Sequence, residues 1–188
     1  NRMLDSIGLV NRDLEGYRTF KDGSRMQFFL NMSGSGGTGS NFAQMVVDDW
    51  AAVGVRGIVR ERARTLFFLT LRSREHDFCV TRMNGKINPL IDSKNYVPLR
   101  NSPQAYGYGL WYSMGGLHGD PKAQTSAAVP VPPGHPFRDA MQWLDIAYQA
   151  PTLEQQVAAF KHVTDIAAEH LWIFNICSSP PHLVVVKR

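Results

Sequence analysis

The spacing of apolar residues along the chain changes from that of a strand to that of a helix and back again. Residues 26–32 are apolar at nearly every second position, which is typical of a β-strand with one wetter face, where Asn31 would lie. Gly39 opens a helical repeat of apolar positions, and Gly54 ends it. Those apolar positions are Phe42, Met45, Val46, Trp50 and Val53. Residues 55–60 then predict a second strand.

The same order continues, with a helix over 63–74 and a third strand over 78–81. Strands that alternate with helices indicate an α/β fold, in which a mixed, mostly parallel sheet carries helices on its faces. Ligands of such sheets bind beyond the carboxyl ends of the strands. Arg82, Asn84 and Asn88 follow the third strand and are therefore candidate ligand-binding residues.

Both ends of the chain have regular patterns as well. A short helix stops at Gly8, and residues 11–25 predict a β-hairpin with Asp22-Gly23 as its turn. Near the other end, one helix is predicted over 137–150, with Phe137, Met141, Leu144, Ile146 and Tyr148 on its apolar side. A second helix begins at Thr152, which forms a capping box with Gln155. Residues 172–177 and 183–186 predict two last strands.

Between them, residues 85–136 form a long irregular insertion that holds most of the prolines. It also concentrates aromatic residues, which argues against disorder. These are Tyr96, Tyr106, Tyr108, Trp111 and Tyr112. Two interpretations stay open: a hydrophobic cluster beneath the loop, or an aromatic wall against a ligand.

Composition limits the class of protein. The chain has 188 residues, of which 44% are hydrophobic, so it can bury a core as one domain. No run of about 18 apolar residues is present that would span a membrane. The formal charge of +4 comes largely from arginines between Arg56 and Arg82, which alternate with apolar residues and fit the solvated side of a helix. We therefore expect no nucleic-acid partner.

The sequence offers little for catalysis or metal binding. The histidines and cysteines lack metal-ligand spacing, so we expect no metal. Cys79 and Cys177 lie in apolar stretches typical of buried thiols, and a disulfide between them stays open. Ser113 and His118 are neighbours in the sequence, but no third residue orients them as a catalytic pair, and we expect a protein that is not an enzyme.

A glycine loop provides the main alternative. Gly34, Gly36 and Gly39 form G-x-G-x-x-G between a strand and a helix, as in dinucleotide-binding domains. Alternating serines make this loop resemble a slack connector, and the following helix packs without any cofactor. A Rossmann-like oxidoreductase therefore remains the alternative function, and no cofactor is expected. A third class is a protein-interaction domain whose insertion aromatics face a partner.

A longer resemblance runs through most of the chain. Its phrases, in order, are LDSIGLVNRDLEGYRTFKDGSRMQFFL, WAAVGV, REHDFCV, NPLIDSKNYVPLR, WYSMGGLHGDP and TLEQQVAAFKHVTDIAAEHLWIFNI. Together they resemble the large extracellular solute-binding proteins of ABC transporters (family 5), which bind peptides, nickel or oligosaccharides. No single phrase is diagnostic, but their order and spacing match the second large lobe of such a protein, which closes over the ligand.

The resemblance implies that residues 1–188 form one α/β lobe of a type II periplasmic-binding fold. A start at Asn1 and an end at Arg188 fit a piece of a longer protein whose other lobe is missing. The resemblance further implies a periplasmic or extracellular location, free or lipid-anchored to the cytoplasmic membrane. It also implies delivery of a peptide or oligosaccharide to a membrane permease.

The candidate ligand-binding residues follow from sheet geometry and from the insertion. The polar candidates are Arg82, Asn84, Asn88 and Asp92, all near the end of the third strand. Trp111 and Tyr112 are the aromatic candidates, since flat rings stack on sugars and also line peptide pockets.

Overall fold

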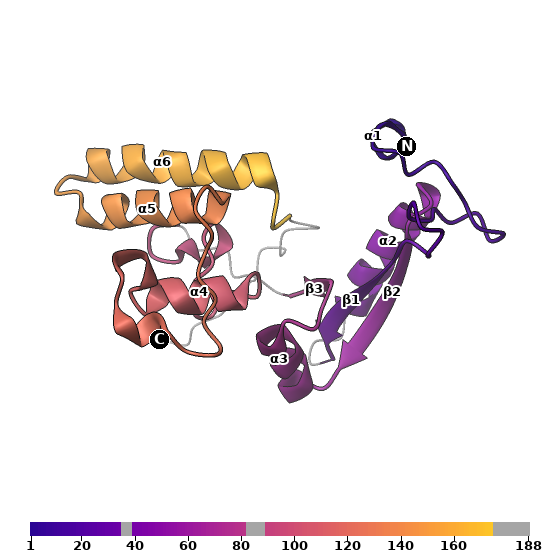
Figure 1. Ribbon diagram of the computed structural model, residues 1–188, viewed down its shortest axis with the longest axis horizontal. Helices are drawn as coiled ribbons and strands as arrows, with labels where there is room; N and C mark the ends of the chain where they lie inside the picture. The colour runs from indigo at the N-terminus through magenta and orange to yellow at the C-terminus, as the bar shows by residue number, and fades with distance from the viewer. Residues whose placement is uncertain (35–38, 82–88, 175–188) are drawn as a thin grey trace, which may run out of the picture.

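The chain folds into a sheet-containing part and a helical part that lie side by side (Figure 1). The structure is a computed structural model, and it describes residues 1–34, 39–81 and 89–174. Residues 1–81 supply the sheet and its helices, and residues 89–174 supply the helical part. Strands and helices together give the α/β fold class that the sequence predicts.

Three strands form one parallel sheet in the order β2-β1-β3. They are β1 (Gln27–Ser33), β2 (Arg56–Arg62) and β3 (Phe78–Val80). The central strand β1 pairs with both neighbours, so that Leu30 lies opposite Val59 on one side and Phe78 on the other. The carboxyl ends of all three strands therefore point to one edge, as predicted.

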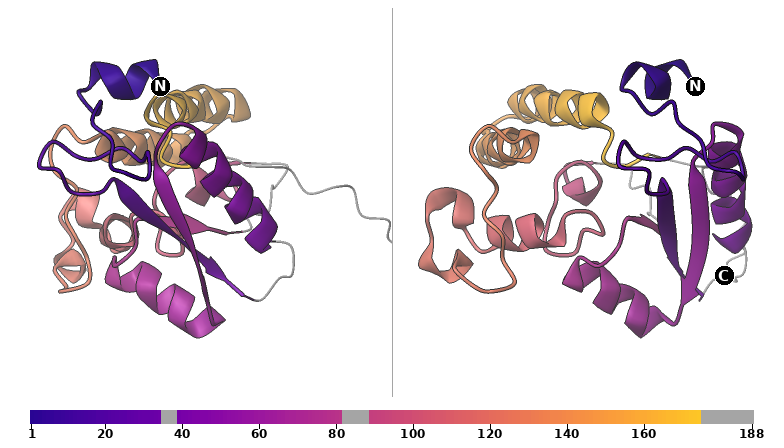
Figure 2. Two further views of the ribbon diagram at one scale, coloured as in Figure 1. Left: turned by 90° about the vertical axis from the view of Figure 1, so that its right-hand side faces the viewer. Right: turned by 45° about the vertical axis from the view of Figure 1, so that its right-hand side comes forward.

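The connecting helices are α2 (Gly39–Ala52) and α3 (Arg64–Ser73), and they lie on opposite sides of the sheet (Figure 2). Helix α2 packs closely on β2 because Gly57 has no side chain. A Cβ at Gly57 would lie 2.8 Å from Val47 Cγ2. Trp50 of α2 also meets Phe78 edge-to-face, with ring centroids 5.0 Å apart. Side-chain packing against the sheet therefore holds helix α2 in place.

The predicted apolar face of α2 is only partly buried. Ala43 is fully buried, whereas Met45 is 59% exposed and Phe42 is also exposed. The three-stranded sheet is narrow, so it covers only the side of the helix that carries Ala43 and Val47.

The segment before the sheet is less regular than the expected hairpin. Helix α1 (Arg2–Ser6) precedes Gly8, whose φ of +87° is the left-handed conformation expected after a helix end. Two isolated antiparallel bridges, Arg12 with Arg18 and Thr19 with Arg25, replace continuous strands.

Arg18 fixes this segment to the sheet. It is 2% exposed, and its guanidinium donates to four acceptors. They are Asn1 Oδ1 at 2.8 Å, Asp5 Oδ1 at 2.7 Å, the Leu9 carbonyl and the Val53 carbonyl at 2.8 Å. Because Val53 follows α2, one buried cation joins the N-terminal segment to the end of that helix.

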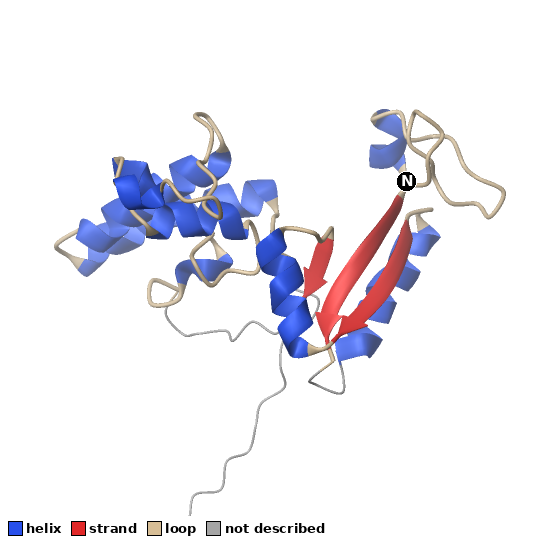
Figure 3. Ribbon diagram, turned by 60° about the horizontal axis from the view of Figure 1, so that its bottom comes forward, coloured by secondary structure: helices blue, strands red, loops and turns tan. Residues whose placement is uncertain are grey.

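The helical part contains three α-helices, which Figure 3 shows apart from the strands. They are α4 (Tyr106–Ser113), α5 (Pro136–Gln149) and α6 (Leu153–His170). Three short 3₁₀ helices complete it: η1 (Ser93–Asn95), η2 (Gly116–His118) and η3 (Pro121–Ala123). The predicted cap of α6 is present, because Thr152 Oγ1 accepts from the Gln155 N–H at 3.3 Å.

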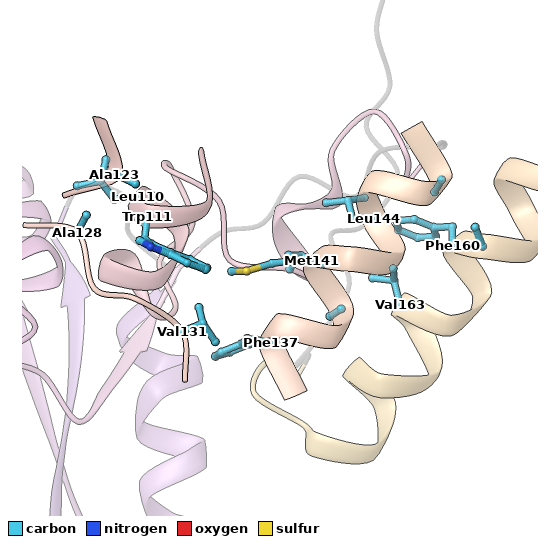
Figure 4. Packing of buried hydrophobic residues seen from close by; sticks show 14 residues of the cluster. Leu110, Trp111, Ala123, Ala128, Val131, Phe137, Met141, Leu144, Phe160 and Val163 are labelled. Atoms are coloured by element: carbon cyan, nitrogen blue, oxygen red, sulfur yellow. The ribbon is translucent and has the colours of Figure 1, made fainter. Parts of the chain in front are cut away.

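The core of the helical part explains the aromatic residues of the insertion. Trp111, Met141, Leu144 and Phe160 are buried together between α4, α5 and α6 (Figure 4). Four further aromatic residues pack against this core while partly buried: Tyr96, Tyr106, Tyr108 and Tyr112. Of the two interpretations, the hydrophobic cluster is therefore correct for these rings. The insertion is also more regular than predicted, since α4 lies within it.

Two expectations at the C-terminal end differ from the structure or fall outside it. Ile146 and Tyr148, predicted on the apolar side of α5, are both about half exposed because α6 covers the opposite side of that helix. Residues 172–174 form no strand, and the rest of the predicted strands lies outside the described residues. None of the helices in the described ranges is long and apolar enough to cross a membrane.

We expect Arg18→Ala to release the N-terminal segment. The substitution leaves the half-exposed Asp5 carboxylate, Asn1 Oδ1 and two carbonyls without their donor, and the loss of such charge-assisted hydrogen bonds costs about 1.5–3 kcal/mol. Hydrogen exchange in the full-length protein should show faster exchange for the amides of residues 9–18. Arg25→Ala is the control, because its ion pair with Glu15 is exposed and contributes at most about 1 kcal/mol.

We expect Leu144→Ala to destabilise the helical part strongly. Leu144 is fully buried between α5 and α6, and a Leu→Ala change at such a site costs about 2–5 kcal/mol. Ile146→Ala on the same helix is the matched control and should cost less than about 1 kcal/mol. Denaturant unfolding of the full-length protein measures both, and equal losses would contradict this account of the core.

Candidate functional site

The carboxyl edge of the sheet is organised by one buried amide. Asn31 of β1 is 1% exposed, its Oδ1 accepts from Arg62 Nε at 3.0 Å, and its Nδ2 donates to the Phe78 carbonyl at 3.3 Å. The side chain therefore joins all three strands. The sequence-based expectation that Asn31 lies on a wetter face is wrong, because these bonds satisfy the amide inside the sheet.

Arg62 is the cation held at this edge. It is the last residue of β2, and its carbonyl accepts from the Gly34 N–H at 2.9 Å. The neighbouring Glu61 carboxylate lies so close to Gly34 that a Cβ there would be 2.6 Å from Oε1. The start of the glycine loop is thus packed against the end of β2. Gly36 lies outside the described residues, as do Arg82, Asn84 and Asn88.

Asp92 is the one described polar candidate from the end of the third strand. It precedes η1 as its N-cap residue, but its side chain makes no capping bond. Its Oδ2 pairs with Lys94 Nζ at 3.3 Å instead. The adjacent Ser93 Oγ lies 2.8 Å from the Tyr148 hydroxyl, which ties this turn to α5.

Trp111 is buried, with 6% of its surface exposed, and it is both a core residue and part of a cavity wall. Its ring lies beneath the guanidinium of Arg138, whose Cζ is 5.5 Å from the ring centroid. The pyrrole part of the ring packs against Gly116, where a Cβ would lie 2.3 Å from Nε1, 2.4 Å from Cε2 and 2.5 Å from Cδ1 and so would press on the ring face. Trp111 therefore presents an edge to the cavity.

The cavity itself has a volume of about 340 Å³ and lies among α4, η2 and η3. Its polar residues are Asp120, Gln124 and Thr125, and Asp120 is the only ionisable residue among the described residues that line it. Asp120 Oδ1 accepts from the Lys122 N–H at 2.9 Å and so caps η3. This volume is at the lower end of the range of about 300–1,000 Å³ for ligand pockets.

Tyr112 points into a hydrogen-bond network instead. Its hydroxyl donates to Asp145 Oδ1 at 2.6 Å, and His118 Nε2 lies 2.9 Å from Asp145 Oδ2. Burial, together with the neighbouring carboxylate, raises the pKa of Tyr112 above its usual range. The network joins α4, η2 and α5, and it holds the phenol protonated at neutral pH.

The three described candidates have different surroundings in the structure. Of Asp92, Trp111 and Tyr112, only Trp111 is among the described residues that line the cavity. Trp111 and Tyr112 are adjacent in α4, but a helix turns about 100° between neighbours, so the two rings leave it in different directions. Trp111 and Tyr112 both stay candidate ligand contacts, and the structure gives them different surroundings.

The described residues offer no candidate metal centre, since no group of three or more His, Cys, Asp or Glu side chains gathers in them. Burial raises the pKa of the Cys79 thiol to about 11, so the thiol is protonated at neutral pH and is a poor nucleophile. Its partner in the open disulfide question, Cys177, lies outside the described residues.

Several residues of these sites were not identified from the sequence. Asn31 within an apolar strand was a usable signal, because a polar residue there needs a buried partner. Asp120 before Pro121 was also readable as a cap followed by a proline. Asp145 and Arg62 carry no such signal, since both look like ordinary polar positions of a helix and a strand.

Comparison with solved structures shows the fold to be part of a periplasmic binding protein. The oligopeptide-binding protein OppA matches with a TM-score of 0.72 and 23% identity over 91% of this chain. MelB from Agrobacterium fabrum C58, solved with stachyose, matches with a TM-score of 0.68 and 14% identity over 90% of the chain. NikA from Brucella suis, solved with Fe(III)-EDTA, matches with a TM-score of 0.62 and 15% identity over 89%.

The chain spans only 27%, 24% and 29% of OppA, MelB and NikA, respectively. The match is therefore to part of one of these proteins, as the resemblance implies for a single lobe. No protein-family model matches the sequence, and no curated protein matches it significantly.

We expect Tyr112→Phe to loosen the contact between α4 and α5. The change removes a hydrogen bond to a carboxylate, worth about 1.5–3 kcal/mol, and leaves Asp145 with His118 alone. Tyr108→Phe on the same helix is the control, because the Tyr108 hydroxyl makes no hydrogen bond to a described residue. Denaturant unfolding of the full-length protein compares the two, and an equal effect would contradict a specific role for the network.

Proposed function

We propose that this chain is part of the ligand-capturing lobe of an extracellular solute-binding protein that serves an ABC importer. The observation that carries the proposal is the match to OppA, whose fold aligns with 91% of the chain at a TM-score of 0.72. The proposed partners are the remaining lobe of the same protein and a membrane permease.

The mechanism proposed is capture by closure. A two-lobed binder rotates its lobes about a hinge, so each lobe needs to supply only part of the ligand site. Two features of this lobe support such a role. Strands ending at one edge hold Arg62 in place through Asn31, and the helical part forms a cavity beside Trp111.

The proposed ligands are a peptide or an oligosaccharide. OppA is named as an oligopeptide-binding protein, and MelB was solved with the tetrasaccharide stachyose. Arg62 offers a cation that suits a peptide carboxylate, whereas the cavity beside Trp111 has hydrogen-bonding groups and no cation among the described residues lining it. Arg82, Asn84, Asn88 and Asp92 stay proposed as further contacts. A periplasmic or extracellular location, free or lipid-anchored, follows as part of the same proposal.

The proposal predicts micromolar or tighter binding of a solute by the full-length protein. Isothermal titration calorimetry with a pentapeptide mixture, raffinose and stachyose measures it, and small-angle X-ray scattering should show a more compact protein when ligand is bound. NAD and ATP serve as the negative probes, because they test the alternative at the Gly34-Gly39 loop.

Micromolar binding of NAD or ATP without binding of any solute would contradict the transport role. It would favour the Rossmann-like alternative instead, with phosphates at the start of α2. Binding of none of the five probes combined with no change in scattering would contradict both functions and leave a protein-interaction domain as the favoured class.

A further inference from the structure

Three side chains that line the cavity among α4, η2 and η3 each have a polar atom with no hydrogen bond to a described residue. Trp111 Nε1 is the first: its ring is almost completely buried, yet the N–H donates to no other residue that the structure describes. A buried indole N–H ordinarily finds an acceptor, because leaving one unpaired costs about 1–3 kcal/mol. No described residue supplies an acceptor for this N–H, so its acceptor comes from solvent or from a ligand.

The nitrogen of Trp111 lies on the side of the ring that borders the cavity. Figure 4 shows the nitrogen of the Trp111 ring on the side of Ala123 and Ala128. Both alanines line the cavity, as does Gly116, which packs on the face of the pyrrole ring and leaves the N–H edge uncovered on its side. The unpaired N–H is not among the described polar atoms that are sealed from solvent. It therefore faces space that a ligand can enter.

The second and third groups, Asp120 and Gln124, also line the cavity. Asp120 uses Oδ1 to cap η3, and Oδ2 has no hydrogen bond to a described residue. The side-chain amide of Gln124 makes no hydrogen bond with the rest of the described chain either. The cavity thus offers one donor from Trp111, one acceptor from Asp120, and a group that does both from Gln124.

We propose that this cavity binds a mono- or disaccharide unit through its hydroxyl groups. A hydroxyl donates and accepts at once, so one sugar ring can satisfy the Trp111 N–H, the Asp120 carboxylate and the Gln124 amide together. The sugar ring contacts the edge of the indole, because the Arg138 guanidinium covers one face of the Trp111 ring. A ligand with a free carboxylate is disfavoured, since Asp120 is the only charge in the described lining.

This inference names a substrate class for the proposed transport function and rests on it for its biological meaning, but binding at the cavity is measured separately. The full-length protein is labelled with ¹⁵N-tryptophan, and the indole resonance of Trp111 is assigned by its loss in Trp111→Phe. Galactose, sucrose and trialanine are then titrated as probes. We expect one of the sugars to shift the Trp111 resonance in a saturable way.

Two variants test the donors. Trp111→Phe keeps an aromatic ring without the N–H and should weaken sugar affinity, measured by calorimetry, at least about tenfold. Gln124→Ala changes an exposed side chain, so it folds, and should weaken affinity about three- to tenfold. The controls are Trp143→Phe, whose ring stacks on His162, and Gln142→Ala on the exposed side of α5, and both should keep the affinity within about twofold.

The outcomes separate this inference from the transport role. Sugar binding by calorimetry with an unchanged Trp111 resonance and unaffected variants would overturn the cavity assignment and leave the transport role intact. A shift of the resonance by trialanine alone would overturn the saccharide class. No shift with any probe would mean that the cavity holds only water, which also overturns the inference, whereas the transport role fails only if no solute binds anywhere.

Discussion

The buried amide of Asn31 is the interaction on which the arrangement of the sheet depends. Parallel strands are joined by crossover connections, so their carboxyl ends all lie at one edge of the sheet. Polar side chains near these ends need hydrogen-bond partners there. Asn31 supplies them from the central strand, binding the Arg62 side chain of β2 and the Phe78 carbonyl of β3. The strand β3 pairs with β1 through only three residues, and this amide lies within that short ladder.

The helical part is held together by apolar packing. Its core is built from segments that follow one another along the chain, with α5 and α6 packed as neighbours on Leu144 and Phe160. Trp111 extends this core towards the loops, where Gly116 lets the pyrrole face of the indole approach the backbone. The same ring therefore stabilises the fold and forms a wall of the cavity, so a substitution there affects packing as well as any ligand.

Under the proposed transport role, the two parts would offer a solute different chemical groups. The sheet edge presents the Arg62 cation, which the Asn31 side chain holds in place, and the cavity beside Trp111 presents the Asp120 carboxylate with the uncharged Gln124 and Thr125 side chains. A cationic and a mainly uncharged surface suit different parts of a solute. Since the chain spans about a quarter of OppA, the other lobe would supply the opposing contacts.

The sequence by itself determined the elements, because the spacing of apolar residues reports which face of each element is buried. The three parallel strands, α2, α3, α5 and the Thr152 cap of α6 agree with that pattern. Only the tertiary structure decided which polar residues meet. Asn31 and Arg62 are far apart in the sequence, as are Tyr112 and Asp145, and their contacts depend on strand register and helix packing that no local pattern records. The same holds for exposure, since a narrow sheet leaves Met45 uncovered although its spacing is that of a core residue.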